Sequence, residues 1–450
     1  MSGTSVALSG GGHRASLFGL GVLLYLADAE KNGSVNSISS VSGGSLTNAY
    51  IGQVLDYRGA SAAEFREKAG RPLASMIANQ GTFFAPVRTK IYVVVLVVSL
   101  LAILIAPWFL PIECCWSALV VMAGVPLWIW LIYGLRGRVC ARAFRDMLFS
   151  QDGQPTLMSQ LESAVDHVIY STDLRTSEPV FFCRSFVYGY RFGPGTPSDL
   201  QVADAVQASA CFPGGFPPVK MPAKRFGFQG PPKGSGLKAP ASRLVLVDGG
   251  VYDNMGDEWA RGYAARLRQW DALSPDREPD TLILVDSSVN PAWNPFPAVT
   301  IPVISEVASM LRDMDVLYTN TTTTRRQALI ERFDRAQRSG SGLHGALVQI
   351  SQSPFHVASR FQDADKEWPE RAARARATIA RLDPQTEAEW ARIAHENATL
   401  PTTLNALGQE TSARLLRHGY VLAMCDLHVI LDYPLLDIPG PKAFDELVAP

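Results

Sequence analysis

The stretch Ser5-Val-Ala-Leu-Ser-Gly-Gly-Gly-His-Arg-Ala15 decides the fold of this 450-residue chain. It opens with a short apolar run that ends at Leu8, and three glycines follow soon after. Apolar residues then recur at helical spacing from Leu17 to Ala27. A short apolar run, a glycine turn and a run of helical period predict a strand, a tight turn and a helix.

A second unit of the same kind follows the first. Ile38 and Val41 lead into Ser42-Gly-Gly-Ser45, and a helical run continues through Val54. Two successive strand–turn–helix units predict an α/β fold with a mostly parallel sheet. Later strands are predicted from continuous apolar character, which is typical of strands covered on both faces, at residues 179–182, 244–247 and 281–285.

A strongly apolar insert interrupts this α/β pattern. Between Ile91 and Leu135, 37 of 45 residues are apolar, and Glu113 carries the only charge. The rest of the chain has the composition of a soluble protein. Lys plus Arg number 41 and Asp plus Glu number 42, so the formal net charge is −1, and we expect no nucleic-acid partner.

The insert has the dimensions of a helical hairpin in a bilayer. Ile91–Leu110 and Trp116–Leu135 are each about 20 residues long, and Pro111–Cys115 forms the hinge between them. Basic residues flank the insert and none lies in the hinge, which predicts both flanks in the cytosol. The alternative is a hairpin buried inside the protein, but a single charge favours membrane insertion, spanning or re-entrant. The flanking basic residues are Arg88, Lys90, Arg136, Arg138, Arg142 and Arg145.

The first glycine turn can serve more than one chemistry. Backbone N–H groups of Gly10–Gly12 point toward one spot, and the start of the following helix adds positive potential. Such a turn can hold a phosphate or a developing oxyanion. Gly10-x-Gly12-x-x-Ala15 also matches a relaxed dinucleotide-binding pattern, with Asp28 or Glu30 as the acidic residue for the ribose. A dinucleotide-binding oxidoreductase is therefore an alternative at this stage.

Ser42 occupies a position typical of a catalytic nucleophile. A strand turns sharply into a helix at Ser40-Val-Ser-Gly-Gly44, and a serine at such an elbow projects its hydroxyl from a strained turn. The usual pattern has glycine two residues before the nucleophile, whereas this chain has Ser40 there. The alternative is a plain glycine turn with a helix-capping serine.

Asp248-Gly249-Gly250 follows a predicted strand and is the third candidate. An aspartate at the carboxyl end of a strand lies where active sites form in α/β proteins. The alternative is a turn aspartate without a chemical role. A similar strand ends at Asp286, so position in the sheet does not by itself select Asp248.

Together these motifs resemble those of the patatin-like phospholipases, which share their core with the cytosolic phospholipase A2 group. The resemblance runs from about Val6 to Ser288 outside the apolar insert. It implies a three-layer α/β/α fold and a Ser–Asp dyad that works without histidine. The stretches that carry it are Ser9-Gly-Gly-Gly-His-Arg-Ala15, Val41-Ser-Gly-Gly-Ser45, Ser171-Thr-Asp-Leu174, Ala208-Ser-Ala-Cys-Phe-Pro213 and Val247-Asp-Gly-Gly250.

The resemblance implies a role for each motif. Ser42 is the nucleophile that attacks an ester carbonyl of a lipid, and Asp248 is the general base and then the general acid. His13 neighbours the glycine turn, but the family uses no catalytic histidine. The implied oxyanion-hole residues are Gly10, Gly11 and Gly12, and the supporting residues are Arg14, Gly43, Gly44, Gly249 and Gly250. Arg14 is expected to buttress the glycine turn or to neutralise a phosphate.

These assignments predict a membrane-anchored serine lipid acylhydrolase of the phospholipase or lysophospholipase type, with a lipid ester and the bilayer as partners. A non-catalytic membrane scaffold on the same fold is the alternative. The six cysteines are scattered, and no zinc or calcium pattern occurs, so we expect neither a metal nor a cofactor. The predicted division is a first part of the patatin-like domain (1–90), the hairpin (91–135), a second part with the catalytic aspartate (136–335) and a mostly helical C-terminal extension (336–450).

Three further expectations concern location and local structure. The first apolar run lacks the features of a signal peptide, so we expect the catalytic domain and both chain termini on the cytoplasmic side of the membrane. Lys220–Arg243 is rich in Pro, Gly and Lys and predicts a loop. Thr321–Thr324 is expected to lead into a helix that begins near Arg325.

Overall fold

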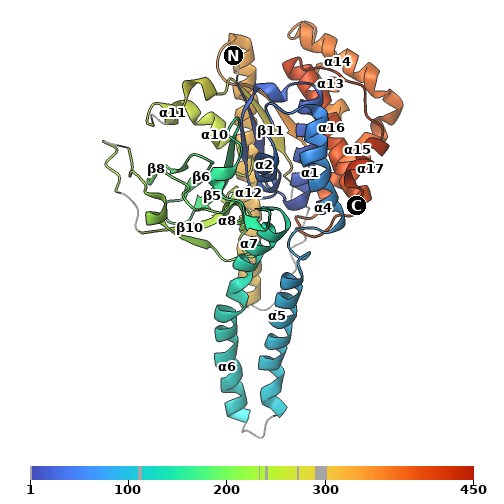
Figure 1. Cartoon of the computed structure of the whole chain (residues 1–450). Coiled ribbons are helices and arrows are strands. Elements are labelled where there is room, and N and C mark those ends of the chain that lie inside the picture. The colour runs from blue at the N-terminus through green and yellow to red at the C-terminus, as the bar shows by residue number, and fades with distance from the viewer. Residues whose placement is uncertain (1–2, 110–113, 233, 239–241, 271–272, 289–301) are drawn as a thin grey trace.

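The centre of the fold is a ten-stranded sheet (Figure 1). The computed structural model describes residues 3–109, 114–232, 234–238, 242–270, 273–288 and 302–450. The strand order is β12-β11-β1-β2-β5-β6-β7-β8, and β10 pairs with both β5 and β9. The strands are β1 Thr4–Leu8, β2 Val35–Ser40, β5 Asp166–Asp173, β6 Glu178–Phe182, β7 Val187–Gly189, β8 Gly193–Gly195, β9 Val219–Pro222, β10 Arg243–Asp248, β11 Thr281–Asp286 and β12 His344–Gln349, with β3 Ser150–Gln151 and β4 Gln154–Pro155 as a separate pair.

One half of the sheet is parallel and carries the first glycine turn and Ser42. β12, β11, β1, β2 and β5 run in the same direction, and Val6 lies opposite Ile38 on one side and Ile283 on the other. β6, β7, β8, β9 and β10 pair in antiparallel fashion. The predicted α/β fold and the three later strands are therefore confirmed. The sheet is mixed, because its other half is antiparallel.

Helices cover both faces of the sheet. Val6 and Leu8 pack into one hydrophobic core and Ala7 into another, because successive side chains of a strand point to opposite faces. The larger core takes in α1, α2 and α16, and the other face packs under α12. The helices are α1 Gly12–Asp28, α2 Gly43–Val54, α3 Ala62–Phe65, α4 Arg71–Asn79, α5 Val87–Ile105, α6 Cys114–Leu131, α7 Arg136–Met147, α8 Val202–Ser209, α9 Gly250–Asp253, α10 Glu258–Arg261, α11 Tyr263–Leu267, α12 Pro302–Ser339, α13 Phe355–Phe361, α14 Pro369–Leu382, α15 Glu387–Thr399, α16 Gln409–Leu431 and α17 Lys442–Val448.

The C-terminal residues are part of the domain core. A Cβ atom at Gly21 of α1 would lie 2.2 Å from the Leu416 carbonyl oxygen of α16, so the two helices meet at backbone distance. Residues 336–450, expected as a helical extension, also supply β12, which continues the sheet beside β11. The sheet and its larger core are therefore complete only when the last quarter of the chain is in place.

Two local expectations differ from the structure. The sequence pattern predicts a loop over Lys220–Arg243, but β9 forms an edge strand there and pairs with β10. An edge strand tolerates a proline such as Pro222 at its end. The helix predicted from Arg325 begins far earlier, because α12 runs unbroken from Pro302 and contains Thr321–Thr324. Thr322 is buried, so packing overrides the weak helix propensity of threonine.

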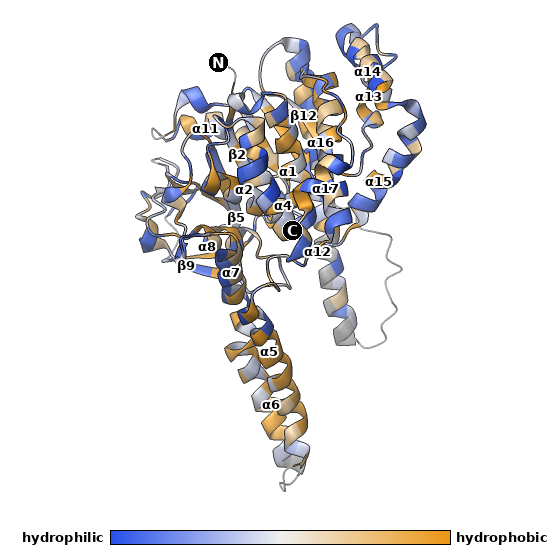
Figure 2. Ribbon diagram, turned by 45° about the vertical axis from the view of Figure 1, so that its right-hand side comes forward, coloured by the Kyte–Doolittle hydropathy of each residue, from blue (hydrophilic) through white to orange (hydrophobic). Residues whose placement is uncertain are grey.

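The apolar insert projects from the domain as a helical hairpin (Figure 2). Val87–Phe109 and Trp116–Met147 are long and apolar enough to cross a membrane. Only 6% of the most apolar part of each segment is buried, so the structure differs from the alternative of a hairpin enclosed in the protein. Residues 110–113, most of the predicted hinge, lie outside the described residues, which resume at the start of α6.

Polar side chains of the hairpin form hydrogen bonds between its two helical segments. The Trp128 indole donates to the Ser99 hydroxyl at 2.9 Å, and the Tyr92 hydroxyl donates to the Ile132 carbonyl at 2.9 Å. Internal partners of this kind are what a helix needs in hydrocarbon, where no water can satisfy its polar groups.

The direction of β1 and β2 determines which end of the sheet faces the hairpin. The N-terminus lies at the end of the molecule opposite the hairpin, and β1 starts there (Figures 1 and 2). β1 therefore runs toward the hairpin, and the parallel β2 runs with it. The carboxyl ends of both strands, where the two glycine turns begin, face the hairpin end of the domain.

Candidate active site

Ser42 lies at a strained turn between β2 and α2. Its backbone has φ 50° and ψ −116°, a conformation that a residue with a side chain adopts only at a cost in energy. The Ser42 N–H donates to the Ser209 hydroxyl at 3.0 Å, which holds the turn in place. The side chain is mostly buried and borders the cleft described below. The sharp strand-to-helix turn predicted from the sequence is therefore present.

Ser40 stands where the usual elbow pattern has glycine, and its hydroxyl is fully engaged. It accepts hydrogen bonds from the Asn48 amide at 2.8 Å and from the Ser45 hydroxyl at 3.1 Å, and it donates to a carbonyl of β5 at 3.3 Å. Ser45 also bonds the Ser209 hydroxyl at 2.9 Å. Ser40 thus starts a chain of hydrogen bonds that ends at the backbone N–H of Ser42.

Asp248 ends β10 beside Ser42. The Gly250 N–H donates to its carboxylate at 2.8 Å, and Ser42 borders the same cleft. Burial raises the pKa of Asp248 to about 7, and the interactions with Gly250 and Ser42 oppose that rise. A carboxylate with a pKa near neutrality is a better base than an ordinary aspartate, whose pKa is about 4.

Asp286, the other strand-end aspartate, is engaged elsewhere. Arg326 of α12 holds one oxygen of its carboxylate through Nη2 at 2.6 Å and Nε at 3.1 Å. The other oxygen accepts from the Ser288 N–H at 2.9 Å, so both oxygens of this carboxylate already have partners. The structure thus distinguishes two aspartates that occupy similar positions in the sequence pattern.

The first glycine turn faces Ser42, since a Cβ atom at Gly10 would lie 3.3 Å from the Ser42 Cβ. The Gly10 N–H donates to the Asn254 carbonyl at 3.0 Å and is therefore already used. Among the described residues, the N–H groups of Gly11 and Gly12 have no such partner. These two groups, at the positive end of α1, are the candidate oxyanion-hole donors with a free N–H among the three predicted glycines.

Glycine is required where the turns meet. A Cβ atom at Gly43 would lie 2.0 Å from the Gly12 carbonyl oxygen, and one at Gly249 would lie 2.9 Å from the Tyr170 carbonyl oxygen. No side chain fits at either position without moving the backbone. The other two supporting glycines are similarly confined: Gly44 and Gly250.

Arg14 follows the glycine turn in the sequence, and its hydrogen bonds suit a role in supporting that turn. Its guanidinium donates to the Ser287 carbonyl through Nε at 3.2 Å and Nη2 at 3.0 Å, and to the Leu400 carbonyl through Nη1. Burial lowers the pKa of Arg14 to about 10, which leaves it charged at neutral pH. It links the start of α1 to the end of β11 and to a C-terminal strap, residues 400–405.

His13 is held by the same strap. Its backbone N–H donates to the Thr403 carbonyl at 3.0 Å, and its Nδ1 bonds the Asn405 carbonyl at 2.7 Å, so Nδ1 carries the proton. Nε2 then accepts from the Thr82 hydroxyl at 2.9 Å. Burial lowers the pKa of His13 to about 4, and both ring nitrogens are used. His13 therefore positions the glycine turn.

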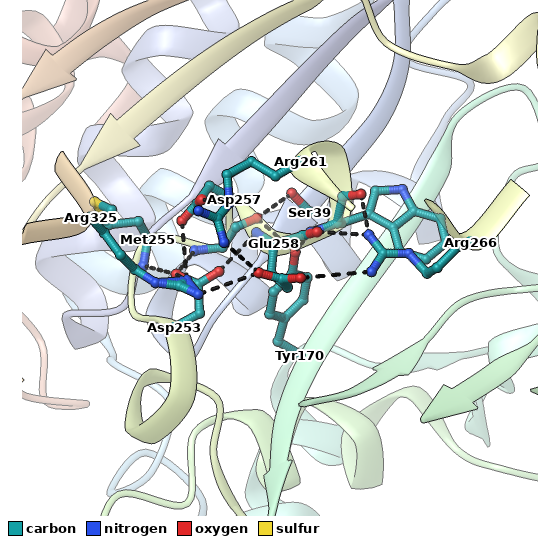
Figure 3. A network of polar contacts seen from close by, with 11 residues as sticks. Ser39, Tyr170, Asp253, Met255, Asp257, Glu258, Arg261, Arg266 and Arg325 are labelled. Carbon is teal, nitrogen blue, oxygen red and sulfur yellow. Dashed lines mark hydrogen bonds and ion pairs between the residues drawn. The ribbon is translucent and has the colours of Figure 1, made fainter. Parts of the chain in front are cut away.

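A buried charge network holds the segment that follows Asp248 (Figure 3). Asp253 accepts from the backbone N–H groups of Met255 at 3.0 Å and Glu258 at 2.9 Å. Arg325 of α12 lies 3.5 Å from Asp253 and 3.3 Å from the Glu258 carboxylate. The network ties the Asp248 turn to the middle of α12.

The sheet anchors the other side of this network (Figure 3). The Ser39 hydroxyl of β2 donates to the Gly256 carbonyl at 2.7 Å, and the Tyr170 hydroxyl of β5 donates to the same carbonyl at 2.9 Å. Asp257 pairs with Arg261 at 2.8 Å, and burial, together with the nearby Asp253, raises the pKa of Asp257. The turn after Asp248 is thus fixed to the strands on which Ser42 depends.

The candidate residues share a cleft of about 410 Å³. Ser42, Asp248, Gly10, Gly11 and Arg14 all border it. The sequence analysis did not give a role to its remaining lining residues, which are Phe212, Pro213, Val251, Asn254, Ser288, Tyr318, Thr319 and Thr402. Phe212 and Pro213 belong to a stretch already recognised as family-like, whereas no local pattern marks the residues from α12 and the strap. In the described part of the chain, no three His, Cys, Asp or Glu side chains are grouped as metal ligands.

This arrangement defines a class of α/β proteins that carry a serine at a nucleophile elbow. Residues 6–256, more than half of the chain, match the family described as patatin-like phospholipase, and the chain belongs to that family. The resemblance found in the sequence motifs is therefore confirmed. No curated protein matches the chain by sequence.

Solved structures show a distant likeness. Human GIVD cytosolic phospholipase A2 shares 13% identity at a TM-score of 0.48, and the match covers 99% of this chain and 63% of that chain. VipD from Legionella pneumophila shares 12% identity at a TM-score of 0.30, covering 100% of this chain and 88% of that chain. This chain thus spans less than two thirds of the length of the human phospholipase chain.

We predict that the reactivity of Ser42 rises with pH through about 7. Below that pH the Asp248 carboxyl is protonated and cannot accept the serine proton, and above it the carboxylate is the base. The measurement is the rate of fluorophosphonate labelling of detergent-solubilised protein from about pH 5 to about pH 9, with the adduct mapped by mass. Asp248→Asn is expected to abolish the labelling, and a flat profile for the wild type would contradict the prediction.

We also predict that Ser40→Ala destabilises the fold while Ser42 keeps its reactivity. The Ser45 hydroxyl would lose its buried acceptor, which costs about 1–3 kcal/mol in the free energy of unfolding, while Asn48 keeps two carbonyl acceptors. Denaturant titration measures that loss, and fluorophosphonate labelling measures the site. Ser341→Ala, which alters an exposed hydrogen bond, is the control and leaves stability unchanged. Equal stability of the two variants would refute the role given to Ser40.

Proposed function

We propose that this protein is a membrane-anchored serine lipid acylhydrolase of the phospholipase or lysophospholipase type, with Ser42 and Asp248 as its catalytic dyad. The observation that carries the proposal is the strained Ser42 on one cleft with Asp248, a buried aspartate whose pKa is raised. Membership of the patatin-like phospholipase family supports a lipid ester hydrolase.

The proposed reaction proceeds through an acyl-enzyme. Ser42 Oγ attacks the ester carbonyl while its proton passes to Asp248, and the carbonyl oxygen becomes an oxyanion. The N–H groups of Gly11 and Gly12 stabilise that charge. Asp248 then returns the proton to the leaving alcohol. Water, deprotonated by the same carboxylate, attacks the acyl-enzyme, and Ser42 recovers its proton as the fatty acid leaves.

Burial of Asp248 explains how a dyad works without histidine. An aspartate with a pKa near 7 accepts and returns a proton at neutral pH, the task that histidine performs in a triad. His13 cannot take that role in this geometry, because its ring bonds Asn405 and Thr82.

The dinucleotide-binding alternative lacks a comparable observation. Asp28, a candidate for the ribose, lies at the far end of α1 and pairs with Arg66, while the Tyr420 hydroxyl donates to it at 2.7 Å. The glycine turn of that pattern faces Ser42 instead. A non-catalytic scaffold on the same fold predicts an unreactive Ser42, and the labelling experiment above distinguishes the two.

The hairpin is proposed as the membrane anchor. Two exposed apolar helices leave the domain and return to it, so the segments before α5 and after α6 lie on one side of the bilayer. The basic residues on both flanks support a cytoplasmic location for that side, with the catalytic domain and both termini.

We predict that Ser42→Ala and Asp248→Ala each abolish hydrolysis of lipid esters. Loss of a nucleophile or its base typically costs about 10³–10⁶ in turnover. Fatty-acid release from phosphatidylcholine and lysophosphatidylcholine in mixed micelles is the measurement. Asp199→Asn, at an exposed carboxylate that pairs with Arg225, is the control and keeps activity. Full activity in Ser42→Ala would overturn the dyad.

For the anchor, we predict that the wild type stays with membranes during alkaline carbonate extraction. Val98→Lys combined with Leu101→Lys places two charges on the exposed face of α5, each of which opposes insertion by about 2.5–3.5 kcal/mol. This double variant is expected in the soluble fraction. Ala265→Lys on α11, far from the hairpin, serves as the control (Figure 1). Extraction of the wild type would exclude the anchor.

A further inference from the structure

One loop joins the cleft to the first helix of the hairpin. Phe212 borders the cleft, and its ring lies 5.7 Å from the ring of Phe216. Phe216 packs against Phe83 at 5.7 Å, and Phe83 packs against Phe84 at 4.6 Å, just before α5. We call residues 212–217 the bridging loop.

The bridging loop is also bonded to the base of the second hairpin helix. Arg136, at the start of α7, donates from Nε to the Gly215 carbonyl at 2.6 Å. Its guanidinium stacks on Tyr133 at 3.8 Å from the ring centroid. A Cβ atom at Gly137 would lie 3.5 Å from Pro217. The loop that forms one wall of the cleft thus contacts the base of both hairpin helices.

Apolar side chains remain exposed between the cleft and the hairpin. The exposed fractions are 44% for Phe84, 69% for Val87, 45% for Phe212 and 46% for Val251. Phe212 and Val251 line the cleft, and Val87 begins α5. We call these four residues the apolar rim.

The charges near the rim suit a lipid surface. Arg88, Lys90, Arg138 and Arg142 are exposed at the base of the hairpin. Asp146 is the acidic side chain that the structure places among them, at 3.8 Å from Arg88. A basic collar around an apolar surface is attracted to phosphate headgroups while the apolar part enters the acyl layer.

We propose that the apolar rim docks on the bilayer around the hairpin, and that the acyl chain of a membrane lipid passes along it from the leaflet to Ser42. Phe84 and Val87 of the rim lie directly before and at the start of α5, the first hairpin helix. The carboxyl ends of β1 and β2 face the hairpin end of the domain (Figures 1 and 2). The bilayer that takes up the hairpin is therefore the apolar phase nearest to the cleft. This inference rests on the proposed function and specifies its substrate as a long-chain lipid in a membrane.

The test compares a membrane substrate with a soluble one. Phe84→Asp and Val87→Asp alter the rim at positions outside the cleft. Both are expected to lower hydrolysis of phosphatidylcholine vesicles about tenfold, from the lost apolar contact, and to leave hydrolysis of p-nitrophenyl butyrate within about twofold. Phe84→Leu keeps the apolar contact and is expected to retain both activities. Ala265→Asp on α11 adds the same charge at the opposite end and is the matched control.

The outcomes separate this inference from the proposed function. Equal rates on vesicles for Phe84→Asp and Ala265→Asp overturn the docking surface while Ser42-dependent hydrolysis stands. An equal loss on both substrates would assign Phe84 to the integrity of the site and also overturn it. A wild type without Ser42-dependent hydrolysis of any ester overturns the proposed function instead.

A second measurement does not depend on activity. A spin label is placed on Phe84→Cys or Ala265→Cys in a chain whose Cys114 and Cys115 are replaced by alanine. The other four cysteines are buried and do not react. In phosphatidylcholine vesicles, the label at position 84 is expected to collide more with oxygen than with a soluble nickel chelate, and the label at position 265 to do the reverse. An aqueous signal at position 84 would refute the docking surface.

Discussion

The site depends on the contact between two glycine turns at backbone distance. Gly43 at the start of α2 touches the carbonyl of Gly12 at the start of α1, with no room for a side chain. That contact brings the free N–H groups of one turn to the strained serine of the other, because both turns leave parallel strands at the same edge. Asp248 completes the arrangement from an antiparallel strand, and burial there raises its pKa. Without the close approach of Gly43 to Gly12, the three motifs would lie on one sheet, but their functional groups would be too far apart to act on one substrate.

Much of this could be predicted because the relevant information is local. A strand, a glycine turn and a helix leave a recognisable pattern within about 25 residues, and the unit is repeated around Ser42. The apolar insert can also be predicted from the sequence, because only one of its 45 residues is charged. Family-like motifs then select Ser42 and Asp248 from several polar residues at strand ends. The match to the patatin-like family over residues 6–256 agrees with that reading.

The parts that could not be predicted depend on residues far apart in the sequence. The hydroxyl of Ser209 supports Ser42 across 167 positions, and Arg326 engages Asp286 and so distinguishes it from Asp248. The length of α12 was missed because the buried Thr322 follows tertiary packing rather than local helix propensity. The hydrogen-bond partner of the Gly10 N–H could not be predicted for a similar reason, since it is a backbone carbonyl beyond β10. Contacts of this kind leave no periodic signal.

The C-terminal strap has a consequence for the order in which the protein matures. Thr403 and Asn405 hold the glycine turn, and β12 and α16 complete the core, so the site cannot form until these C-terminal segments have been synthesised and have left the ribosome. The hairpin, which ends near residue 135, emerges about 270 residues earlier, a delay on the order of tens of seconds during synthesis. On the proposed topology the chain is tethered to its membrane before it can cleave a lipid. On that topology, the order of synthesis would confine hydrolysis to the membrane into which the hairpin is inserted.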